Sequence, residues 1–528
     1  MRITLMLLAI LCPFFGHRST ALAVEPPKAR TNVLFVISDD LNNLLGCYGD
    51  PQVKTPNIDR LAARGVRFDR AYCAFPLCGP SRNSLLTGLY PNSTGIHANG
   101  QIFRQTIPDR LSMSQAFRQQ GYVAARLGKL YHYNVPNSIG TDGHDDPASW
   151  ELEVNPAGVD RLEEHSKIFS LVPNQFGGTL SWYASPQSTE HHTDAKIAQD
   201  AEWVLERCAK RNDRPFFVAV GFFRPHTPYV APKTPWFDMY DVNAMPVVSG
   251  VAEDLADIPA PALQSQKKDQ LEMTDAQRRE ARQAYLACIS FMDAQVGHLL
   301  DALDKQGLSE NTIIVFTSDH GYHMGEHGLW QKMSLFEESS RVPLLIIAPG
   351  CEKGTVCRSP VSHVDLYPTL MELCGLTAPE GLQGQSLVPM LKDSTAKGRG
   401  WALTQVTRTL PANQRKKQAE SKQAADTKDA ATAKASAAPD QPNRYFGYSL
   451  RTERWRYTEW ADGDKGAELY DHDTDPRELH NLAEHKDYQA TKTELAEQLH
   501  TAIKTTYPPS GQTPELQPGL WAPLLTKP

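Results

Sequence analysis

The sequence lacks features that would place it among membrane, nucleic-acid-binding or disulfide-rich proteins. Beyond residues 3–15, no run reaches the roughly 18 apolar residues that a membrane-spanning helix requires. Its 54 lysines and arginines stand against 61 aspartates and glutamates, so a net charge of -7 excludes a generally basic surface for nucleic acid. Nine cysteines in 528 residues do not make a disulfide framework. Cys351 and Cys357 flank a short turn and fit either a local disulfide or two free thiols.

The apolar stretch at the N-terminus has the pattern of a secretory signal peptide. Arg2 supplies a positive charge, residues 3–15 are too short to span a bilayer stably, and small residues precede a cleavage point after Ala23. We therefore expect residues 1–23 to be removed and the mature protein to be secreted or periplasmic. An uncleaved anchor is the alternative.

Strands alternating with helices are predicted for most of the chain. The unbroken apolar run at residues 33–37 is typical of a strand buried on both faces, as in a parallel sheet covered by helices. Similar runs predict strands at residues 216–220, 312–317 and 342–348. Helices are predicted from Pro56, with Thr55 as its cap, at residues 194–209, with Asp194 as a cap, and at residues 276–306. This alternation predicts an α/β fold, a large, mostly parallel sheet sandwiched by helices.

The C-terminal part has a different pattern. Short segments rich in aromatic and β-branched residues predict a smaller antiparallel sheet at residues 401–408, 445–452 and 455–460, followed by a helix at residues 485–505. We expect a catalytic domain at residues 24–398 and a C-terminal subdomain at residues 399–528. Residues 411–443 contain no aromatic residue and are rich in Ala, Lys, Gln, Asp and Ser, which predicts a mobile insertion, with a lone helix as the alternative.

The segment Cys-Gly-Pro-Ser-Arg at residues 78–82, followed by Leu-Thr-Gly at residues 86–88, is the sharpest chemical signal. Pro80 suits the first turn of a helix, so Cys78 would lie at the positive end of that helix beside Arg82. That position favours an anion, whether a thiolate or the oxygens of a substrate. A buried structural cysteine is the alternative from the residues alone.

This segment resembles the signature of the sulfatases, a formylglycine-dependent family of the alkaline-phosphatase-like superfamily. The resemblance implies that Cys78 is oxidised to formylglycine by a formylglycine-generating or an anaerobic sulfatase-maturing enzyme. Hydrated formylglycine would attack sulfur, the alcohol would leave, and deprotonation of the second hydroxyl would expel sulfate. The substrate implied is a sulfated carbohydrate.

Two polar pairs, Asp39-Asp40 and Asp319-His320, each follow a predicted buried strand. The carboxyl ends of parallel strands converge on one crevice, where three carboxylates repel unless a divalent cation neutralises them. Oxygen ligands favour calcium or magnesium. Similar sulfatases bind one calcium ion with these four positions and the formylglycine oxygen at Cys78, although many have asparagine in place of His320. The alternative is that each pair only caps the loop after its strand and binds no metal.

Other matches resemble the iduronate-2-sulfatase branch of the family. They are Gly-Lys-Leu-Tyr-His at residues 128–132, Arg-Pro-His-Thr-Pro at residues 224–228, and the spacing from Asp-His-Gly at residues 319–321 to Lys332. The resemblance covers nearly the whole mature chain and departs at Tyr322, where that branch usually has tryptophan.

The cations and histidines of these motifs have separate expected roles. Arg82, Lys129 and Lys332 can surround a sulfate and offset charge in the transition state. By resemblance, His132 would remove the diol proton, and His226 with Lys332 would bind the sulfate and stabilise or protonate the leaving oxygen.

A uronic-acid 2-sulfate is the substrate that the branch implies. Arg224, two residues before His226, is a candidate to bind the uronate carboxylate. The alternatives are a phosphoester or phosphonate hydrolase of the same superfamily, and a non-catalytic protein that binds sulfated glycans. The pattern His323-x-x-Glu326-His327 matches inverted zinc peptidases, but neighbouring glycines interrupt any helix, so a loop role is expected instead.

Overall fold

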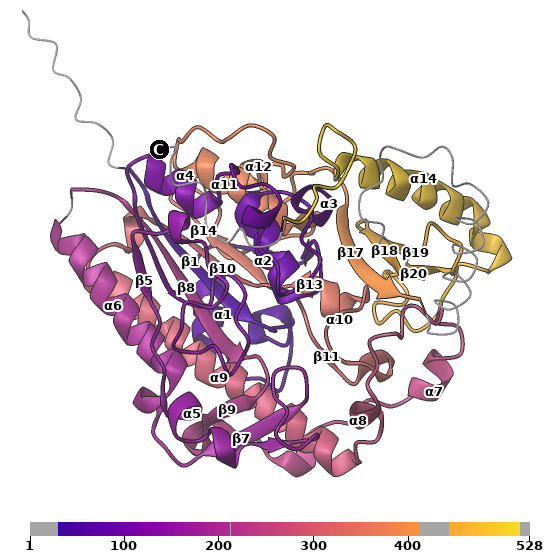
Figure 1. The fold of residues 1–528 in the computed structure, drawn as a ribbon, viewed down its shortest axis with the longest axis horizontal. Helices are drawn as coiled ribbons and strands as arrows, with labels where there is room; N and C mark the ends of the chain where they lie inside the picture. Colours follow the sequence, from indigo (N-terminus) through magenta and orange to yellow (C-terminus); the bar gives the residue numbers. More distant parts are fainter. Residues whose placement is uncertain (1–29, 212, 411–442, 518–528) are drawn as a thin grey trace, which may run out of the picture. The chain divides into compact units, whose positions relative to one another are not determined.

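The computed structural model describes residues 30–211, 213–410 and 443–517 (Figure 1). The described residues from Thr31 to Gln517 belong to one compact unit. The expected signal peptide, residues 1–23, and all but the last residue of the expected insertion, residues 411–443, lie outside the described residues.

An eight-stranded sheet forms the centre of the fold, in the order β15-β2-β14-β10-β1-β8-β4-β5. Its strands are β1 (Asn32–Asp39), β2 (Val66–Phe68), β4 (Val123–Gly128), β5 (Leu152–Val154), β8 (Phe216–Pro225), β10 (Thr312–Ser318), β14 (Leu344–Ile347) and β15 (Thr355–Cys357). The strands from β10 to β5 run parallel, and β14 pairs antiparallel with both neighbours. The mostly parallel sheet predicted from the sequence is confirmed.

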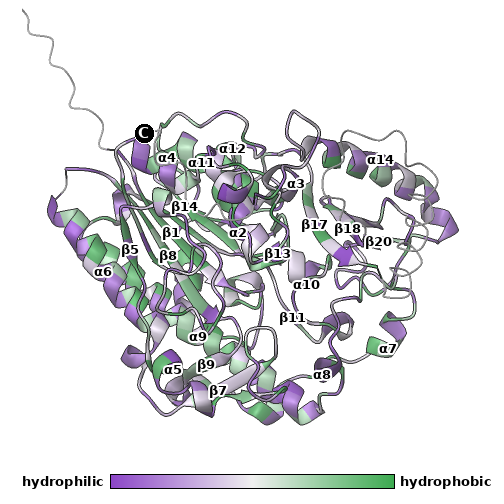
Figure 2. Ribbon diagram, viewed as in Figure 1, coloured by the Kyte–Doolittle hydropathy of each residue, from purple (hydrophilic) through white to green (hydrophobic). Residues whose placement is uncertain are grey.

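Helices cover both faces of this sheet (Figure 1). One face packs against α1 (Pro56–Ala62), α6 (Thr193–Arg211) and α9 (Asp275–Lys305), and the other against α2 (Cys78–Thr87), α4 (Met113–Gln119), α11 (Leu366–Leu373) and α12 (Val388–Lys392). Successive residues of β1 enter the two cores in turn, Leu34 on the α9 side and Phe35 on the α2 side. The central strands are accordingly apolar along their length (Figure 2).

Helix α9 has the length and apolar composition of a membrane-spanning helix, yet 83% of its most apolar 18-residue stretch is buried inside the protein. It packs on α6, β8 and β9 (Tyr229–Pro232). It is therefore a core helix of the sandwich, whose apolar character serves packing between layers.

Two predicted helix caps and one predicted strand differ from the sequence-based expectations. Thr55 precedes α1 as predicted, but its hydroxyl accepts a hydrogen bond from the Gly46 backbone and does not cap the helix. Asp194 lies inside α6 and accepts hydrogen bonds from the backbone of Phe223 and Arg224 at the end of β8. The strand predicted at residues 342–348 is divided by Pro343, which has no N–H to donate to a ladder.

Smaller sheets and short helices fill the connections. One sheet has the order β13 (Arg341–Val342), β3 (Ala71–Tyr72) and β16 (Val361–Ser362). A second has the order β6 (Phe169–Ser170), β7 (Ser181–Ser185) and β9, and a third pairs β11 (His323–Met324) with β12 (Trp330–Gln331). The short helices are α3 (Pro91–Thr94), α5 (Val159–Leu162), α7 (Val251–Asp254), α8 (Lys268–Leu271) and α10 (Glu337–Ser340).

The C-terminal part forms the antiparallel sheet predicted from its aromatic segments. It comprises β17 (Ala402–Thr409), β18 (Arg444–Arg451), β19 (Trp455–Trp460) and β20 (Ala467–Asp471), and α14 (Gln489–Thr505) packs on β18 and β19. The fourth strand was not predicted. The domain boundary expected between residues 398 and 399 stays a prediction.

A buried ion cluster joins this sheet to the segment that follows β12. Arg456 on β19 pairs with Glu337 of α10 and with Glu478; Arg456 and Glu478 are fully buried, and the side chain of Glu337 is 12% exposed. Burial alone would raise the pKa of Glu478, but the Arg456 charge and His472 lower it to about 2. Glu337 also pairs with Arg451 and Arg341, whereas Arg456 is the largest source of charge compensation for Glu478.

Replacing Arg456 by methionine is expected to lower the free energy of unfolding by about 3–5 kcal/mol, because it leaves the fully buried carboxylate of Glu478 without its main cation. Urea unfolding followed by tryptophan fluorescence measures the loss. Arg60→Met is the matched control, since Arg60 pairs with Asp301 where both side chains are exposed (44% and 70%), and its loss should be clearly smaller. Equal losses in the two variants would contradict a special role for the buried cluster.

Candidate active site

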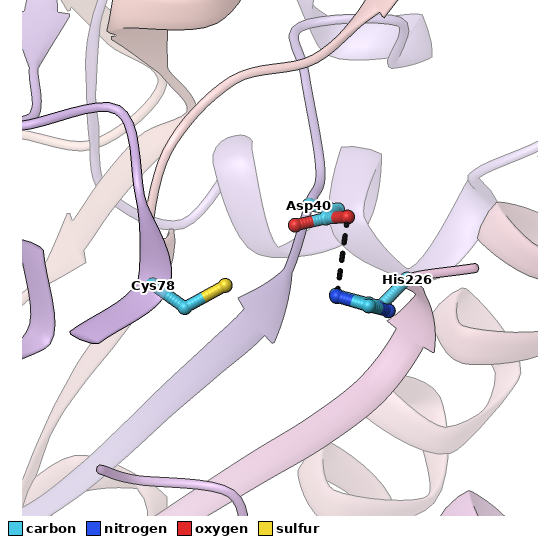
Figure 3. Close-up of side chains that lie close together, drawn as sticks. All are labelled: Asp40, Cys78 and His226. Carbon is cyan, nitrogen blue, oxygen red and sulfur yellow. Dashed lines mark ion pairs between the residues drawn. The ribbon is translucent and has the colours of Figure 1, made fainter. Parts of the chain in front are cut away.

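The carboxyl ends of β1, β8 and β10 meet at one edge of the central sheet. Asp39 ends β1 and Asp40 follows it, His226 follows β8, and Asp319 and His320 follow β10. Because β1 pairs in parallel with both other strands, these ends lie side by side. Figure 3 shows the side chains of Asp40 and His226 beyond the tips of their strands.

Three carboxylates gather at this edge. One oxygen each from Asp39, Asp40 and Asp319 lies within 4.8 Å of the others, and all three residues are fully buried. Oδ2 of Asp40 is buried without a hydrogen-bond partner. Burial raises the pKa of Asp40, and the nearby Lys332 charge opposes that rise only in part. A group of buried carboxylates with an unpartnered oxygen fits a divalent cation.

Cys78 is the first residue of α2, and its thiol points toward Asp40 and His226 (Figure 3). Its Sγ lies 3.3 Å from Nε2 of His320 and 3.3 Å from Nζ of Lys332. The structure therefore brings the cysteine of the signature segment into contact with the residues that follow the strands.

Arg82, one turn further along α2, is fully buried and holds the acidic cluster in place. Its Nε donates to Asp319 Oδ2 at 2.9 Å, and Nη2 lies 3.3 Å from Asp39 Oδ1. Nη1 donates to the carbonyls of Lys129 and Leu130. The guanidinium is fully engaged by protein groups, so Arg82 acts on the carboxylates more directly than on a substrate.

Two lysines each pair with one of the aspartates. Lys129 follows β4 and its Nζ lies 2.5 Å from Asp39 Oδ2, while Lys332 follows β12 and lies 2.5 Å from Asp40 Oδ1. Although burial alone would lower it, the charges of Asp40 and the Cys78 thiolate form raise the pKa of Lys332 well above its usual value. Lys332 therefore presents a permanent positive charge next to Cys78.

Two buried histidines are held in their neutral form. Burial, together with the Lys129 charge, lowers the pKa of His132 to about 2, and its Nδ1 has no hydrogen-bond partner. Burial and Lys332 also lower the pKa of His226, whose Nε2 lies 3.6 Å from Asp40 Oδ2. Both imidazoles are therefore neutral at neutral pH, and the unpartnered Nδ1 of His132 can take part in a further hydrogen bond.

A cavity of about 800 Å³ opens over these groups. His132, His226 and Lys332 line it, together with Lys267 and Gln331, which the sequence did not single out. Lys267 lies in a polar loop segment where nothing in the residue pattern distinguishes it from its neighbours.

Two residues near the site have roles that differ from the sequence-based expectations. Arg224 is buried and engaged by Asp160 at 2.6 Å and by the carbonyls of Val230 and Pro228, so it is not placed to bind a uronate carboxylate. Tyr322 is also fully buried, where its ring stacks on Tyr285 and its hydroxyl bonds to Tyr229. Tyrosine in place of tryptophan at position 322 therefore changes the packing of the core beneath the site.

The segment that resembles a zinc-peptidase pattern forms a short strand and a single 3-10 turn at Glu326–Gly328, and no α-helix. His323 belongs to β11, and His327 has a φ of 55°, a left-handed conformation incompatible with a regular helix. The carboxylate of Glu326 accepts the backbone N–H of Met324 at 2.6 Å, and His327 donates to Asp254. The expected loop role fits this geometry.

Beneath the site, His363 lies between α2 and β10, within 3.2 Å of Thr317 Oγ1. Burial lowers its pKa to about 3, against about 6.5 in an unfolded chain. The unfolded state therefore binds a proton below about pH 6.5 that the folded state does not bind until about pH 3, and stability falls as pH falls through this window.

Between pH 7 and pH 5 this one residue is expected to remove about 2 kcal/mol from the free energy of unfolding. In His363→Gln the drop between these pH values should shrink by that amount. Urea unfolding at both pH values measures it, and an unchanged drop would show that His363 is not held neutral.

Comparisons with known proteins agree with this architecture. The family model described as Sulfatase matches residues 31–376. The chain is 33% identical over 479 residues to a sulfatase of Formosa agariphila, covering 87% of this chain and 84% of that protein. It is 30% identical over 507 residues to iduronate 2-sulfatase of Homo sapiens, covering 85% and 90%. Among solved structures, phosphonate monoester hydrolase of Agrobacterium radiobacter superposes with a TM-score of 0.69 at 25% identity, covering 90% of this chain and 96% of that one.

Proposed function

The chain belongs to the sulfatase family and is a sulfuric ester hydrolase, and on that premise we propose that it removes the 2-O-sulfate of a uronic acid in a sulfated polysaccharide or its fragments. The observation that carries the proposal is the position of Cys78, in contact with His320 and with Lys332, which pairs with Asp40 of the acidic cluster and lines the cavity. The motifs shared with the iduronate-2-sulfatase branch favour the uronic acid.

We propose that Cys78 is converted to formylglycine, for which the thiol in this structure is the precursor. Once hydrated, this group supplies an oxygen nucleophile for sulfur and a second hydroxyl whose deprotonation releases sulfate. The N-terminus of α2 and the ammonium of Lys332, 3.3 Å from Sγ, favour negative charge at this position.

Asp39, Asp40, Asp319 and His320 are the residues that would hold a calcium ion, with magnesium as the alternative. Such an ion neutralises the carboxylates and supplies a Lewis acid for the oxygens gathered there. Arg82 and Lys129 contribute by orienting Asp39 and Asp319 through their ion pairs.

The neutral histidines and Lys332 carry the proton transfers and the charge stabilisation. His132 accepts the proton that accompanies sulfate release, because its Nε2 lies 3.2 Å from Oδ1 of Asn134 and can donate to it, which leaves the unpartnered Nδ1 as the acceptor. His226 and Lys332 bind the sulfate oxygens, and together they stabilise or protonate the leaving oxygen of the sugar. Both face the cavity where the sugar would lie.

The signal-like N-terminus supports export, so we place this reaction outside the cytoplasm, on polysaccharide or on its oligosaccharides. A formylglycine-generating or anaerobic sulfatase-maturing enzyme of the host would convert Cys78 before or during export. Detection of the mature N-terminus of the secreted protein by sequencing tests both the cleavage after Ala23 and the export.

Activity on a panel of defined sulfated disaccharides tests the substrate. Release of sulfate from a 2-O-sulfated uronic acid, faster than from 6-O-sulfated or N-sulfated glucosamine, is the expected result. Cleavage confined to hexosamine sulfates would contradict the uronic acid while leaving the sulfatase assignment intact.

Phosphonate or phosphoester hydrolysis is the second candidate, favoured by the superposition on phosphonate monoester hydrolase. Both reactions need a nucleophile, a cation and donors around a tetrahedral anion, so the geometry alone accommodates either. Side-by-side kinetics on an aryl sulfate and an aryl phosphonate separate them, with the higher kcat/KM expected for the sulfate.

A further inference from the structure

Lys267 is a cation of the active-site cavity that no step of the proposed reaction uses. It lies immediately before α8 and lines the same cavity as His132, His226 and Lys332. Its side chain is half-buried. Its ammonium thus faces the space that the sugar would occupy, and it is partly withdrawn from water.

The contacts of this ammonium leave its charge uncompensated. Its Nζ donates to the carbonyl of Gly178 and, at 2.7 Å, to Oε1 of Gln331. Both acceptors are neutral, and a lysine ammonium carries three N–H donors. Within residues 30–211, 213–410 and 443–517, no carboxylate lies within 4.0 Å of this nitrogen, whereas Lys129 and Lys332 each have one.

The electrostatics agree with these contacts. Burial lowers the pKa of Lys267, and Asp269 opposes this only in part. The charges of Lys332 and Asp40 also act on it, so it lies within the field of the reacting centre. Gln331 connects the two lysines, because its side chain holds Lys267 and its backbone leads directly to Lys332.

Two arginines, Arg408 and Arg444, also line the cavity, but they are less suited than Lys267 to bind an anion. Arg408 donates to the carbonyls of Pro261, Thr407 and Met333, so its guanidinium is engaged by backbone. Arg444 is exposed at the rim, where an ion pair contributes little. Lys267 combines partial burial, a remaining donor and an unbalanced charge, which together make a strong anion-binding group.

We propose that Lys267 determines specificity by binding a second anionic group of the substrate while the sulfate to be cleaved lies beside Lys332. This inference rests on the proposed function and adds the requirement that the substrate be doubly anionic. A sugar carboxylate or a second sulfate has the chemistry that Lys267 recognises. The uronic acid of the proposed substrate supplies the carboxylate.

Binding measured in the unreactive Cys78→Ala protein tests this without requiring turnover. The ligands are a disaccharide with a 2-O-sulfated uronic acid, a glucosamine with two sulfates, and an aryl sulfate with no second anion. Adding Lys267→Met should weaken binding of one or both doubly anionic ligands, relative to the aryl sulfate, by about 10-fold to 100-fold, the range for a charged hydrogen bond. Lys268→Met is the matched control, since Lys268 is the next residue, is 86% exposed and pairs with Glu272.

The pattern across the ligands identifies the anion. A selective loss for the uronic acid indicates a carboxylate, and a selective loss for the disulfated glucosamine indicates a second sulfate. An equal effect on all three ligands, or an effect equal to that of Lys268→Met, would overturn the inference. In the Cys78 protein, the same substitution should raise KM for the doubly anionic substrate more than it changes kcat. Absence of turnover in the Cys78 protein would instead count against the proposed function.

Discussion

Replacing Cys78 by alanine is expected to reduce kcat/KM for sulfate esters by about 10⁴-fold or more while the protein stays folded. Alanine removes the side chain from which the nucleophile is formed, and His320 and Lys332 offer no substitute oxygen at that position. Sulfate release from an aryl sulfate measures the loss. Cys288→Ala is the matched control, because Cys288 is a fully buried free thiol of α9 that lies in the core.

Mass spectrometry of the peptide containing Cys78 separates the causes of any inactivity. Conversion of the thiol to the aldehyde exchanges a sulfur and two hydrogens for one oxygen, which shifts the peptide mass. This shift can occur only in the protein that carries Cys78 and not in Cys78→Ala. A fully unconverted peptide from the native host would favour the non-catalytic glycan-binding alternative. Full activity of Cys78→Ala would show that another residue is the nucleophile.

Removing divalent cations with a chelator is expected to lower activity by more than about 100-fold, and added calcium should restore it. The reason is electrostatic: Asp39, Asp40 and Asp319 are buried with one oxygen from each within 4.8 Å of the others, and Oδ2 of Asp40 has no hydrogen-bond partner among the described residues. Thermal unfolding provides a second measurement that does not depend on catalysis. Calcium at 100 times its Kd should stabilise the protein by about 2.7 kcal/mol.

Asp40→Asn should reduce the stabilisation by calcium, since it removes one charge and one ligand oxygen. Asp293→Asn is its control, because Asp293 is a buried carboxylate that accepts the backbone N–H groups of Asn57 and Ile58 away from the cluster. An undiminished calcium response in Asp40→Asn, or restoration of activity by no divalent cation, would contradict the metal assignment.

The positions of Asp39, Asp40 and Asp319 show why much of the site was predictable. Each follows an apolar run that had to form a buried strand, and parallel strands of one sheet present their carboxyl ends at the same edge. A local pattern therefore implied contact between residues about 280 positions apart. The helix after Cys78 was predictable for a similar reason, because its first-turn proline acts within a few residues.

Arg224 and Lys267 show where this reasoning stops. Arg224 stands two residues from His226, but its partner Asp160 comes from α5, which no spacing in the sequence connects with β8. Lys267 and Lys268 are neighbours of the same type, yet one lines the cavity and the other is exposed. Which way each side chain faces depends on how the surrounding loops pack.

The sequence by itself determined the alternation of strands and helices, the acidic strand ends and the signature segment at Cys78, because hydrophobic periodicity and turn chemistry act over a few residues. Only the tertiary structure decided which cations are engaged by protein groups and which face the cavity. Arg82 is saturated by Asp39 and Asp319, whereas Lys267 keeps an unbalanced charge. Charge compensation is a property of three-dimensional neighbours, since Coulomb energy depends on distance and burial and not on separation along the chain.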